Sequence, residues 1–389
     1  MIGNVSIKFG FCGAGQGGGR FAAEASNRYG YPSIVINCAR SDLDGLELSP
    51  KRKLFLDYGL DGAGKNLVFG REAFEQNRER IKDFIRIHLS DDVEYITICV
   101  GGGGGTGSGG VSVLIEIFQE LGLPVGMIIT LPLESEDTTT KQNCLTTLKR
   151  LLSTDGVRPL IIVDNEKIHT KYPHLSVNQI WPTANREVIQ TFHLFNMFSA
   201  KKSEHHSFDM ADYQMMLRTP GCMAMGRADI TEYRGKEELA ESAKHAITSG
   251  LFAEGFDLAT AQKAGIIIRG TKKVFDRIKA IDLDYMYNYI RDQIQAGTIY
   301  RGVYQIDGLG DHIEIYSIFA GLDLPKERLK TLSAETQQEQ EIVAQKKSRA
   351  SIVDDVFGTE SEYNETREDD EFLEFIKKKT SKKKDGFWK

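Results

Sequence analysis

GGGGGTGSGG, residues 101–110, lies between an apolar, strand-like run, Tyr95 to Val100, and an amphipathic helical segment, Val111 to Leu121. Glycine allows backbone amides to approach phosphate oxygens closely, and the N-terminus of a following helix favours negative charge. Thr106 and Ser108 add two hydroxyl groups. A flexible linker can also be rich in glycine, but glycines beside a buried strand cost backbone entropy unless something fills the loop. The stretch therefore predicts a phosphate-binding loop.

Around this loop, short apolar runs alternate with helix-length segments up to about residue 164. The expected strands are Val5 to Phe9, Ser33 to Ile36, Tyr95 to Val100, Val125 to Leu131 and Leu160 to Val163. The expected helices are Phe21 to Asn27, Arg71 to His88 and Val111 to Leu121. Strands that alternate with helices predict a parallel sheet of the α/β class, here of Rossmann type.

The distal part of the chain has a different pattern. A helical run, Asn185 to Phe198, has no strand directly after it and is interpreted as a boundary element. Beyond it we expect two helices and three strands, at Asp209 to Leu217, Lys236 to Ser249, Gly265 to Gly270, Gly302 to Asp307 and His312 to Phe319. This mixture indicates a separate α+β domain.

The segment from Lys326 to Ala350 is rich in Glu, Gln, Lys and Ala, which predicts a long exposed helix. We therefore divide the chain into five parts. They are an α/β domain with the glycine loops (residues 1–184), a central helix (185–203), an α+β domain (204–325), a C-terminal helix (326–353) and a flexible tail (354–389).

The composition is that of a globular protein, with 389 residues, 41% of them hydrophobic, and a mean hydropathy of −0.31. No apolar run is long enough for a membrane-spanning helix, and the N-terminus lacks the features of a secretory signal. Five cysteines are scattered without a C-x-x-C pair, which argues against disulfides and a thiolate zinc site. The eight histidines form no H-E-x-x-H motif, and we expect no transition metal. The expected location is the cytoplasm.

Charge is distributed unevenly along the chain. Residues 354–376 contain ten acidic residues and one arginine, for a net charge of −9, whereas residues 377–389 contain seven lysines and one aspartate, for +6. With −6 overall, the remaining body carries −3. An acidic segment with a basic tip is typical of an interaction tail, although a disordered tail that only aids solubility is the alternative. Six lysines form the basic cluster: Lys377, Lys378, Lys379, Lys382, Lys383 and Lys384.

Two further glycine-rich stretches leave other nucleotide sites open. Residues 13–18, GAGQGG, fit the dinucleotide pattern G-x-G-x-x-G, but a Rossmann site also needs an acid at the end of the second strand. The first acid after that strand, Asp42, lies well beyond its expected end. Residues 59–66, GLDGAGKN, nearly match a P-loop, but Asn66 replaces the hydroxyl residue that ligates Mg²⁺.

Taken together, the three loops resemble those of the tubulin/FtsZ superfamily. Residues 103–109 match its phosphate loop, G-G-G-T-G-[ST]-G; residues 13–20 resemble its first nucleotide loop; and residues 62–70 resemble the loop that senses the γ-phosphate. Asp164-Asn165-Glu166 matches the D-N-E of tubulin, whose asparagine bonds guanine. Trp181 stands at a base-stacking position, Asn185 matches a second guanine contact, and Pro132 with Glu136 matches the proline and the ribose-binding glutamate of FtsZ.

The resemblance implies a GTPase that binds GTP and GDP, with Mg²⁺ held through the nucleotide phosphates. It makes residues 1–184 the GTP-binding domain and residues 204–325 an activation domain. The implied GTP-binding residues are Gly15, Gln16, Gly17, Gly18, Asn37, Gly62, Ala63, Gly64, Asn66, Gly103, Gly104, Gly105, Thr106, Gly107, Ser108, Glu136, Asn165, Trp181 and Asn185.

Two acids in the distal region are the candidate catalytic residues. Ser207-Phe-Asp209-Met-Ala-Asp212, followed by Gly221 to Gly226, resembles the FtsZ loop whose acids reach the nucleotide of the neighbouring subunit. Asp209 and Asp212 are thereby implied as catalytic, Asp209 foremost. An acid pair before a helix is also ordinary N-capping, which is the structural alternative.

The chain departs from the FtsZ pattern in three places. Asn37-Cys38-Ala39 replaces N-T-D, so a carboxylate on the metal side is missing; Ser207 replaces an asparagine; and the membrane-partner peptide of FtsZ is absent from the end of the sequence. A long helix and a lysine-rich end resemble instead the TubZ branch of plasmids and phages. That branch implies a head-to-tail, multi-stranded filament that segregates DNA through a DNA-bound adaptor on the basic tail, away from any membrane. An FtsZ-like division GTPase and a self-contained NAD-dependent Rossmann enzyme remain the alternatives.

Overall fold

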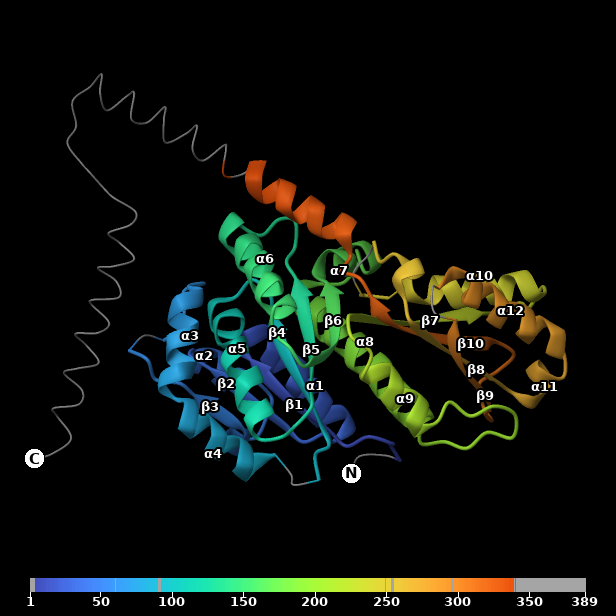
Figure 1. The fold of residues 1–389 in the computed structure, drawn as a ribbon, viewed down its shortest axis with the longest axis horizontal. Coiled ribbons are helices and arrows are strands. Elements are labelled where there is room, and N and C mark those ends of the chain that lie inside the picture. The colour runs from blue at the N-terminus through green and yellow to red at the C-terminus, as the bar shows by residue number, and fades with distance from the viewer. Residues whose placement is uncertain are drawn as a thin grey trace, which may run out of the picture.

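A computed structural model describes residues 4–338 and 340, apart from residues 60, 90–91, 249, 253–254 and 295–296. Its strands form one sheet in the order β3-β2-β1-β4-β5-β6-β7-β10-β8-β9 (Figure 1). The strands are β1 (Phe9–Ala14), β2 (Ser33–Asn37), β3 (Lys53–Phe55), β4 (Tyr95–Gly101), β5 (Val125–Leu131), β6 (Val157–Asp164), β7 (Cys222–Ile230), β8 (Lys263–Gly270), β9 (Thr298–Gln305) and β10 (Ile313–Leu322). Strands β1 to β6 are mutually parallel, as the alternation of strands and helices predicts.

Helices cover both faces of the sheet. They are α1 (Gly15–Tyr29), α2 (Arg40–Asp44), α3 (Leu67–Gln76), α4 (Arg78–His88), α5 (Gly105–Glu120), α6 (Thr138–Leu152), α7 (Asn165–Lys171), α8 (Val177–Phe198), α9 (Met210–Leu217), α10 (Lys236–Thr248), α11 (Lys272–Phe275) and α12 (Ala280–Gln293), with short 3₁₀ turns at Pro50–Arg52 and Leu258–Thr260. A further helix runs over residues 326–338. No helix among the described residues is both long and apolar enough to cross a membrane.

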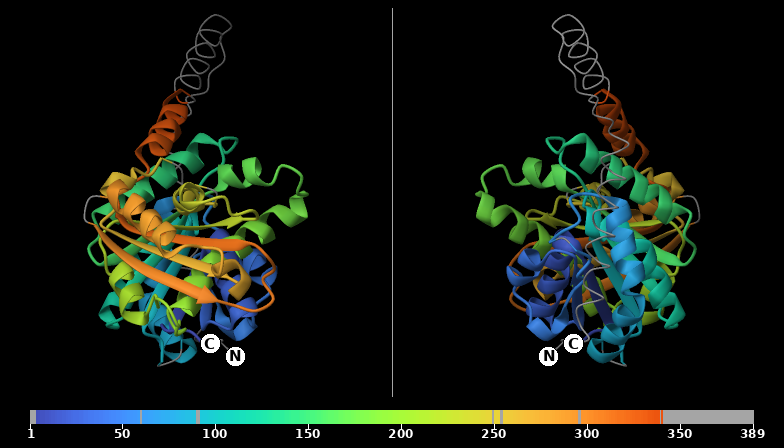
Figure 2. Two further views of the ribbon diagram at one scale, coloured as in Figure 1. Left: turned by 90° about the vertical axis from the view of Figure 1, so that its right-hand side faces the viewer. Right: turned by 90° about the vertical axis from the view of Figure 1, so that its left-hand side faces the viewer.

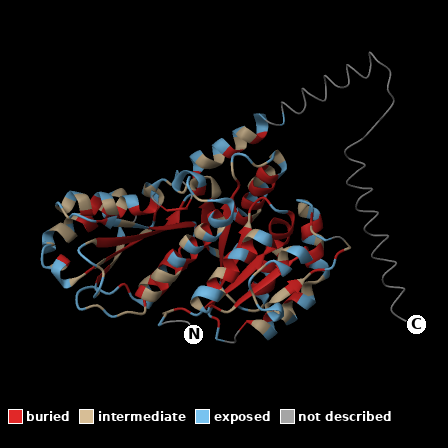
Figure 3. Ribbon diagram, turned by 180° about the vertical axis from the view of Figure 1, so that it is seen from behind, coloured by how far each residue is buried: buried red, intermediate tan, exposed pale blue. Residues whose placement is uncertain are grey.

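The core is divided by the sheet into two layers. Side chains alternate between the faces of a strand, so Cys12 and Ala14 of β1 join one cluster while Phe9 and Phe11 join the other. The first cluster includes residues of α3, α5, α6, α10 and α12, and the second includes residues of α1, α8 and α9. Most residues of the central strands are buried, and the outer sides of the helices are exposed (Figure 3).

Several element boundaries differ from the sequence prediction. The first strand runs over Phe9–Ala14 rather than Val5 to Phe9, and the glycine stretch after β4 enters a helix at Gly105 rather than at Val111. The region from Arg71 to His88 forms two helices that meet at Asn77, and the central helix begins at Val177 rather than at Asn185. The first expected strand shares only Phe9 with β1 and was wrongly placed, whereas the other differences shift or divide an expected helix.

The proximal and distal parts of the sheet meet through a narrow connection. Strand β6 pairs with β7 through one register pair, Leu160 and Cys222, whereas β7, β10 and β8 pair along most of their lengths. Helix α8 packs against α1 and β7 and so bridges the two parts. The left view of Figure 2 shows the distal strands running across the side nearest the viewer, with the helix over 326–338 rising above them. The expected tail, 354–389, and the rest of the C-terminal helix lie outside the described residues.

Candidate functional site

A cavity of about 350 Å³ opens where the carboxyl ends of the parallel strands meet. Its walls come from the residues that follow β1, β4, β5 and β6, and from the N-terminal part of α8. In open parallel sheets this edge is the usual place for a ligand, because all the strand-to-helix loops converge there. The residues around the cavity include Gly15, Gln16, Gly17, Asn37, Gly103, Gly104, Gly105, Thr106, Gly107, Glu136, Asn165, Trp181 and Asn185, all of them predicted site residues.

Two helices begin at this cavity with free backbone donors. Helix α1 starts at Gly15 after Ala14, and α5 starts at Gly105 after Gly104. Neither N-cap residue accepts a side-chain hydrogen bond, and neither first turn contains an acid. The first amides of a helix have no partner within the helix, and the helix dipole adds positive potential there. Two uncapped N-termini at one cavity therefore make a site for an anion with several oxygens.

The glycines of these loops are required by close packing. A Cβ at Gly107 would lie 2.5 Å from the Ala14 carbonyl oxygen, and one at Gly105 would lie 2.8 Å from the Asn66 nitrogen. A Cβ at Gly18 would lie 1.9 Å from the Cys99 oxygen on β4. Side chains at these positions would push the three loops apart, so the small residues let the loops meet around one cavity.

Six of the predicted nucleotide residues support the loops rather than line the cavity: Gly18, Gly62, Ala63, Gly64, Asn66 and Ser108. The Ser108 hydroxyl donates to the carbonyl oxygens of Gly101 (2.9 Å) and Gly102 (2.6 Å). The Asn66 side chain caps α3 by accepting from the Phe69 nitrogen at 2.9 Å. Both side chains are thus committed to holding the loop backbone.

Lys65 reaches the cavity between these loops, although sequence reasoning did not assign it a role. Its backbone has a φ of 62°, and its carbonyl oxygen accepts from the Asn143 amide at 2.7 Å. Its ammonium group pairs with Asp137, the N-cap of α6, and this cation is the main reason that the pKa of Asp137 falls to about 2. Since Lys65 and Arg20 both line the cavity, cationic groups are available for phosphate.

Asp42 also lines the cavity, which corrects the sequence argument that this acid lies too far from β2. Its carboxylate accepts from the Gln16 amide at 3.0 Å and from the Asn37 amide at 3.1 Å. The short helix α2 follows β2 directly and turns Asp42 back to the strand end. Although N-T-D is missing, a carboxylate therefore stands near Asn37.

A second part of the cavity is lined by an aromatic ring and two side-chain amides. Trp181 and Asn185 lie one turn apart on α8, and Asn165 begins α7 directly after β6. Asn185 lines the cavity and is only 9% exposed. Glu136 lines the same region, and one of its carboxylate oxygens accepts from the Leu133 nitrogen at 2.8 Å. An indole and two amides at one cavity are side-chain types that suit a flat ring with polar edges.

Asp209 and Asp212 lie far from this cavity in the same chain. Trp181 and Phe198 stand 17 residues apart on one helix, a separation of about 26 Å at the helical rise per residue. The Tyr304 hydroxyl bonds the carbonyl oxygens of Phe198 (3.1 Å) and Phe208 (3.2 Å), which fixes the acids beside the far end of α8. The chain cannot bring them to its own cavity.

The two acids also form a capping box on α9. The Asp212 nitrogen donates to Asp209 at 3.0 Å, and the Asp209 nitrogen donates to Asp212 at 3.2 Å. The two acids therefore do cap the helix, as the structural alternative predicts. Their carboxylates also stay accessible at the surface and join no ion pair within the described residues. Partial burial, with the charge of Asp209 as a smaller cause, raises the pKa of Asp212.

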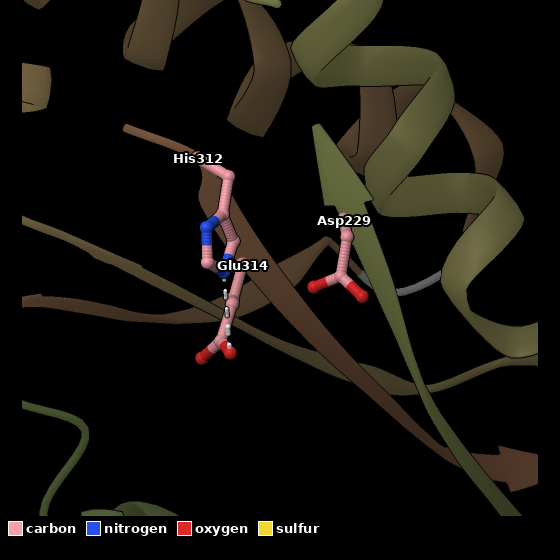
Figure 4. A group of neighbouring side chains, drawn as sticks. All are labelled: Asp229, His312 and Glu314. Atoms are coloured by element: carbon pink, nitrogen blue, oxygen red, sulfur yellow. Dashed lines mark ion pairs between the residues drawn. The ribbon is translucent and has the colours of Figure 1, made fainter. Parts of the chain in front are cut away.

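A separate cluster, Asp229, His312 and Glu314, brings three potential metal ligands within 4.8 Å of one another (Figure 4). Both oxygens of Glu314 are already paired, with Arg227 at 2.9 Å and Arg269 at 3.0 Å. A divalent cation there would face two guanidinium groups. We interpret the cluster as an ion-pair network between β7, β8 and β10.

Comparisons with known proteins agree with this geometry. The family model "Tubulin/FtsZ family, GTPase domain" matches residues 11–173, and "Tubulin-like protein TubZ, C-terminal domain" matches residues 205–326. The tubulin-like protein TubZ of Bacillus cereus is 26% identical over 383 residues, covering 90% of this chain and 88% of that protein. The tubulin-like protein CetZ of Pyrococcus abyssi is 26% identical over 321 residues, with 80% and 84% covered.

Solved structures show the same fold. A GTPγS-form protofilament of Bacillus thuringiensis serovar israelensis TubZ has a TM-score of 0.79 at 22% identity, covering 89% of this chain and 95% of that chain. A two-stranded TubZ filament model has a TM-score of 0.80 at 23% identity, with 93% and 95% covered.

Proposed function

Because the chain belongs to the tubulin/FtsZ family of GTPases, with a TubZ-type C-terminal domain, we propose that it polymerises with GTP and hydrolyses GTP between adjacent subunits. We further propose that its filaments segregate plasmid or phage DNA through a DNA-bound adaptor. The observation that carries the proposal is the pair of uncapped helix N-termini, α1 and α5, which open on a cavity that also contains a base-sized polar and aromatic region.

In the proposed complex, the phosphates lie against the amides that begin at Gly15 and Gly105, with Lys65 beside them. Guanine stacks on Trp181, and its edge is read by Asn165 and Asn185. Phosphoryl transfer depends mainly on positioning and charge stabilisation, which these donors supply before the reaction begins. Cations near the transferred group offset its developing charge.

Mg²⁺ fits this arrangement as an ion bound mostly by phosphate oxygens and water. Asp42 and Thr106 line the cavity, and their side-chain oxygens could hold the ion directly or through water. When bound, the ion neutralises phosphate charge. The residues of the chain still have to orient the nucleotide and the attacking water.

The group that orients the water comes from the next subunit. Asp209 and Asp212 are held at the opposite end of α8 from the cavity, so head-to-tail stacking would place them at the γ-phosphate of a neighbour. Next to them, Met210 and Met215 expose 38% and 46% of their surfaces, which gives this end an apolar rim suited to a subunit contact. Hydrolysis would then require assembly.

The DNA-segregation role rests on the basic cluster at the end of the chain. Its six lysines can hold an adaptor or DNA phosphates, and each phosphate neutralised would contribute about −0.9 to the slope of log affinity against log salt. An acidic body makes direct reading of a DNA sequence a poor alternative. Replacing the six lysines with glutamine should abolish adaptor binding without changing polymerisation; retained binding would remove the tail from the proposal.

Two other functions are separable from this one. An FtsZ-like division GTPase would share the cavity but need no basic tail for its cellular role, so loss of residues 354–389 would spare plasmid inheritance. A self-contained NAD-dependent enzyme would bind NAD and remain a small oligomer. The position of Asp42 near the cavity keeps a ribose contact possible, so NAD binding should be measured directly by equilibrium titration.

Phosphate release from GTP across a range of protein concentrations, with light scattering followed in the same cuvette, tests the proposal. We expect a rate per subunit that rises from near zero above a threshold concentration, together with scattering. A rate per subunit that does not depend on concentration would show a self-contained site and would overturn the filament mechanism.

A further inference from the structure

The helix over residues 326–338 is attached to the nucleotide-binding part of the molecule by buried groups. Leu332 is 0% exposed and Thr336 is 4% exposed, so one side of the helix belongs to the core. At its first turn, the side chains of Arg328 and Asp164 pair while only 9% and 2% exposed. Figure 1 shows the helix at the upper edge of the molecule, above α6 and α7, the helices that follow β5 and β6.

Arg328 joins the ends of two neighbouring strands. Its Nε donates to Asp164 Oδ2 at 2.9 Å, and its Nη2 lies 3.4 Å from both Asp164 Oδ1 and the Pro132 carbonyl oxygen. Asp164 is the last residue of β6, Pro132 follows the last residue of β5, and Leu131 is the register partner of Asp164. One guanidinium group therefore holds two adjacent carboxyl ends of the sheet.

Both strand ends lead directly into the wall of the cavity. Pro132 and Asn165 line it, and Asn165 is bonded through the backbone to Asp164. The Asp164 carboxylate also accepts from the Glu166 nitrogen at 3.1 Å, which starts α7. In turn the Glu166 carboxylate accepts from the Glu134 nitrogen at 2.9 Å. A displacement of Asp164 would thus move both loops at the base end of the cavity.

Stability alone does not account for this arrangement. A buried ion pair gives little net stabilisation, because removing the charges from water offsets most of their attraction. Arg328 Nη1 is in addition buried without a hydrogen-bond partner among the described residues, which costs further free energy. A second anchor of the helix, Lys141 with Glu335 at 3.5 Å, lies farther along it. The Arg328–Asp164 pair therefore adds little to the free energy of unfolding, yet it lies where the two loops at the base end of the cavity are held.

We propose that Arg328 is a positioning residue of the nucleotide site, and that the C-terminal helix controls nucleotide affinity through it. The inference rests on the proposed nucleotide binding and adds a residue that lies 164 positions from Asp164 and touches no ligand. Binding linkage makes the effect reciprocal: loss of the Arg328 contact weakens nucleotide binding, and bound nucleotide strengthens that contact and so holds the helix in place.

Variants within the helix over 326–338 can distinguish a role of Arg328 in positioning the nucleotide site from a role in attaching the helix to the core. Arg328→Met leaves Asp164 buried without its cation, Arg328→Lys keeps the charge but not the two-strand contact, and Leu332→Ala removes an apolar anchor only. Lys330→Ala is the matched control, since Lys330 is 72% exposed and pairs with Glu327 on the same helix. Affinity for GDP and GTP is measured by calorimetric titration, and stability by thermal unfolding without nucleotide.

We expect Arg328→Met to weaken GDP and GTP binding about tenfold and to a similar degree, because the base end serves both. Arg328→Lys should recover part of the loss. Leu332→Ala should lower the Tm but change affinity less than about twofold where it is folded. If Arg328→Met binds both nucleotides as Lys330→Ala does, the inference is wrong. If the unaltered protein fails to bind GTP, the proposed function itself is wrong, so the two failures are distinguishable.

Should Arg328→Met fail to fold, the unaltered protein provides the test. Hydrogen exchange of the amides in residues 326–338 is compared with and without saturating GDP. Linkage requires slower exchange with GDP, and unchanged exchange in this helix overturns the inference.

Discussion

Asp209→Asn offers the most informative single change in the molecule. Asp209 has two roles, since its carboxylate caps α9 and is proposed to act on the nucleotide of a neighbouring subunit. Asparagine caps helices as well as aspartate does, and its side-chain oxygen can still accept from the Asp212 nitrogen. The amide removes the charge alone, whereas Asp209→Ala removes both the charge and the cap.

The two variants should differ in stability but not in activity. Loss of the cap in Asp209→Ala should cost about 0.5–2 kcal/mol of unfolding free energy, whereas Asp209→Asn should cost much less. Loss of a carboxylate that orients the attacking water should reduce hydrolysis by about 10²–10⁴ in both. The filaments formed with GTP should persist, because the γ-phosphate is not removed.

The assay is phosphate release with simultaneous light scattering, above the assembly threshold, with unfolding followed separately in denaturant. A mixture test adds the trans requirement. A mixture of Asp209→Asn with a variant carrying Trp181→Ala and Asn165→Ala should recover part of the normal rate, because an intact cavity of the first variant can then meet intact acids of the second. Normal turnover by Asp209→Asn, or no recovery in the mixture, would refute the reasoning.

Three further predictions concern the cavity and the fold. In a Trp388→Phe background, saturating GDP should change the fluorescence of Trp181, and an unchanged spectrum would place guanine elsewhere. Gly18→Ala should cost more than about 3 kcal/mol of unfolding free energy because its Cβ would meet the backbone of β4, while Gly104→Ala, with 3.9 Å to its nearest neighbour, should cost less than about 1; similar denaturation midpoints would contradict this contrast. Burial lowers the pKa of His193 to about 4, below its value of about 6.5 in the unfolded chain, so its contribution is complete above pH 6.5 and is lost as the pH falls to 4. Between pH 6.5 and 4, His193→Phe should therefore lose about 1–2 kcal/mol less unfolding free energy than the unaltered protein, a figure reduced because the ring is partly exposed. An identical pH dependence of stability in both proteins would exclude this effect of His193.

Local pattern was enough to predict the alternation of strands and helices and the loops that surround the cavity. The predicted boundaries were wrong where small residues weaken the apolar pattern of a strand or helix. Strand β1 contains Gly10 and Gly13 because neighbouring side chains and backbone lie within about 3 Å of where their Cβ atoms would be, and such a strand shows little apolar pattern of its own. For the same reason α5 begins inside a glycine run, where intrinsic propensity alone would place a loop.

Contacts between segments that are distant in the sequence could not be predicted from local patterns. Asp42 reaches the cavity because α2 turns the chain back after β2, and the spacing from β2 alone suggested the opposite. Lys65 was noticed only as part of a P-loop near miss, although its positive φ and its pairing with Asp137 place it at the cavity. Arg328 gave no local signal, because its partner is fixed by the tertiary fold.

The length of α8 has a consequence for any linear strand built from this protein. The cavity and the acids lie at opposite ends of α8, so in the proposed head-to-tail strand n subunits would contain n − 1 complete sites. One terminal subunit would present an open cavity until another subunit adds to it, and the other would present acids with no nucleotide to act on. The two ends of such a strand therefore differ chemically. Nucleotide could exchange without hydrolysis at only one end. The rates at which subunits add and leave need not be equal at the two ends.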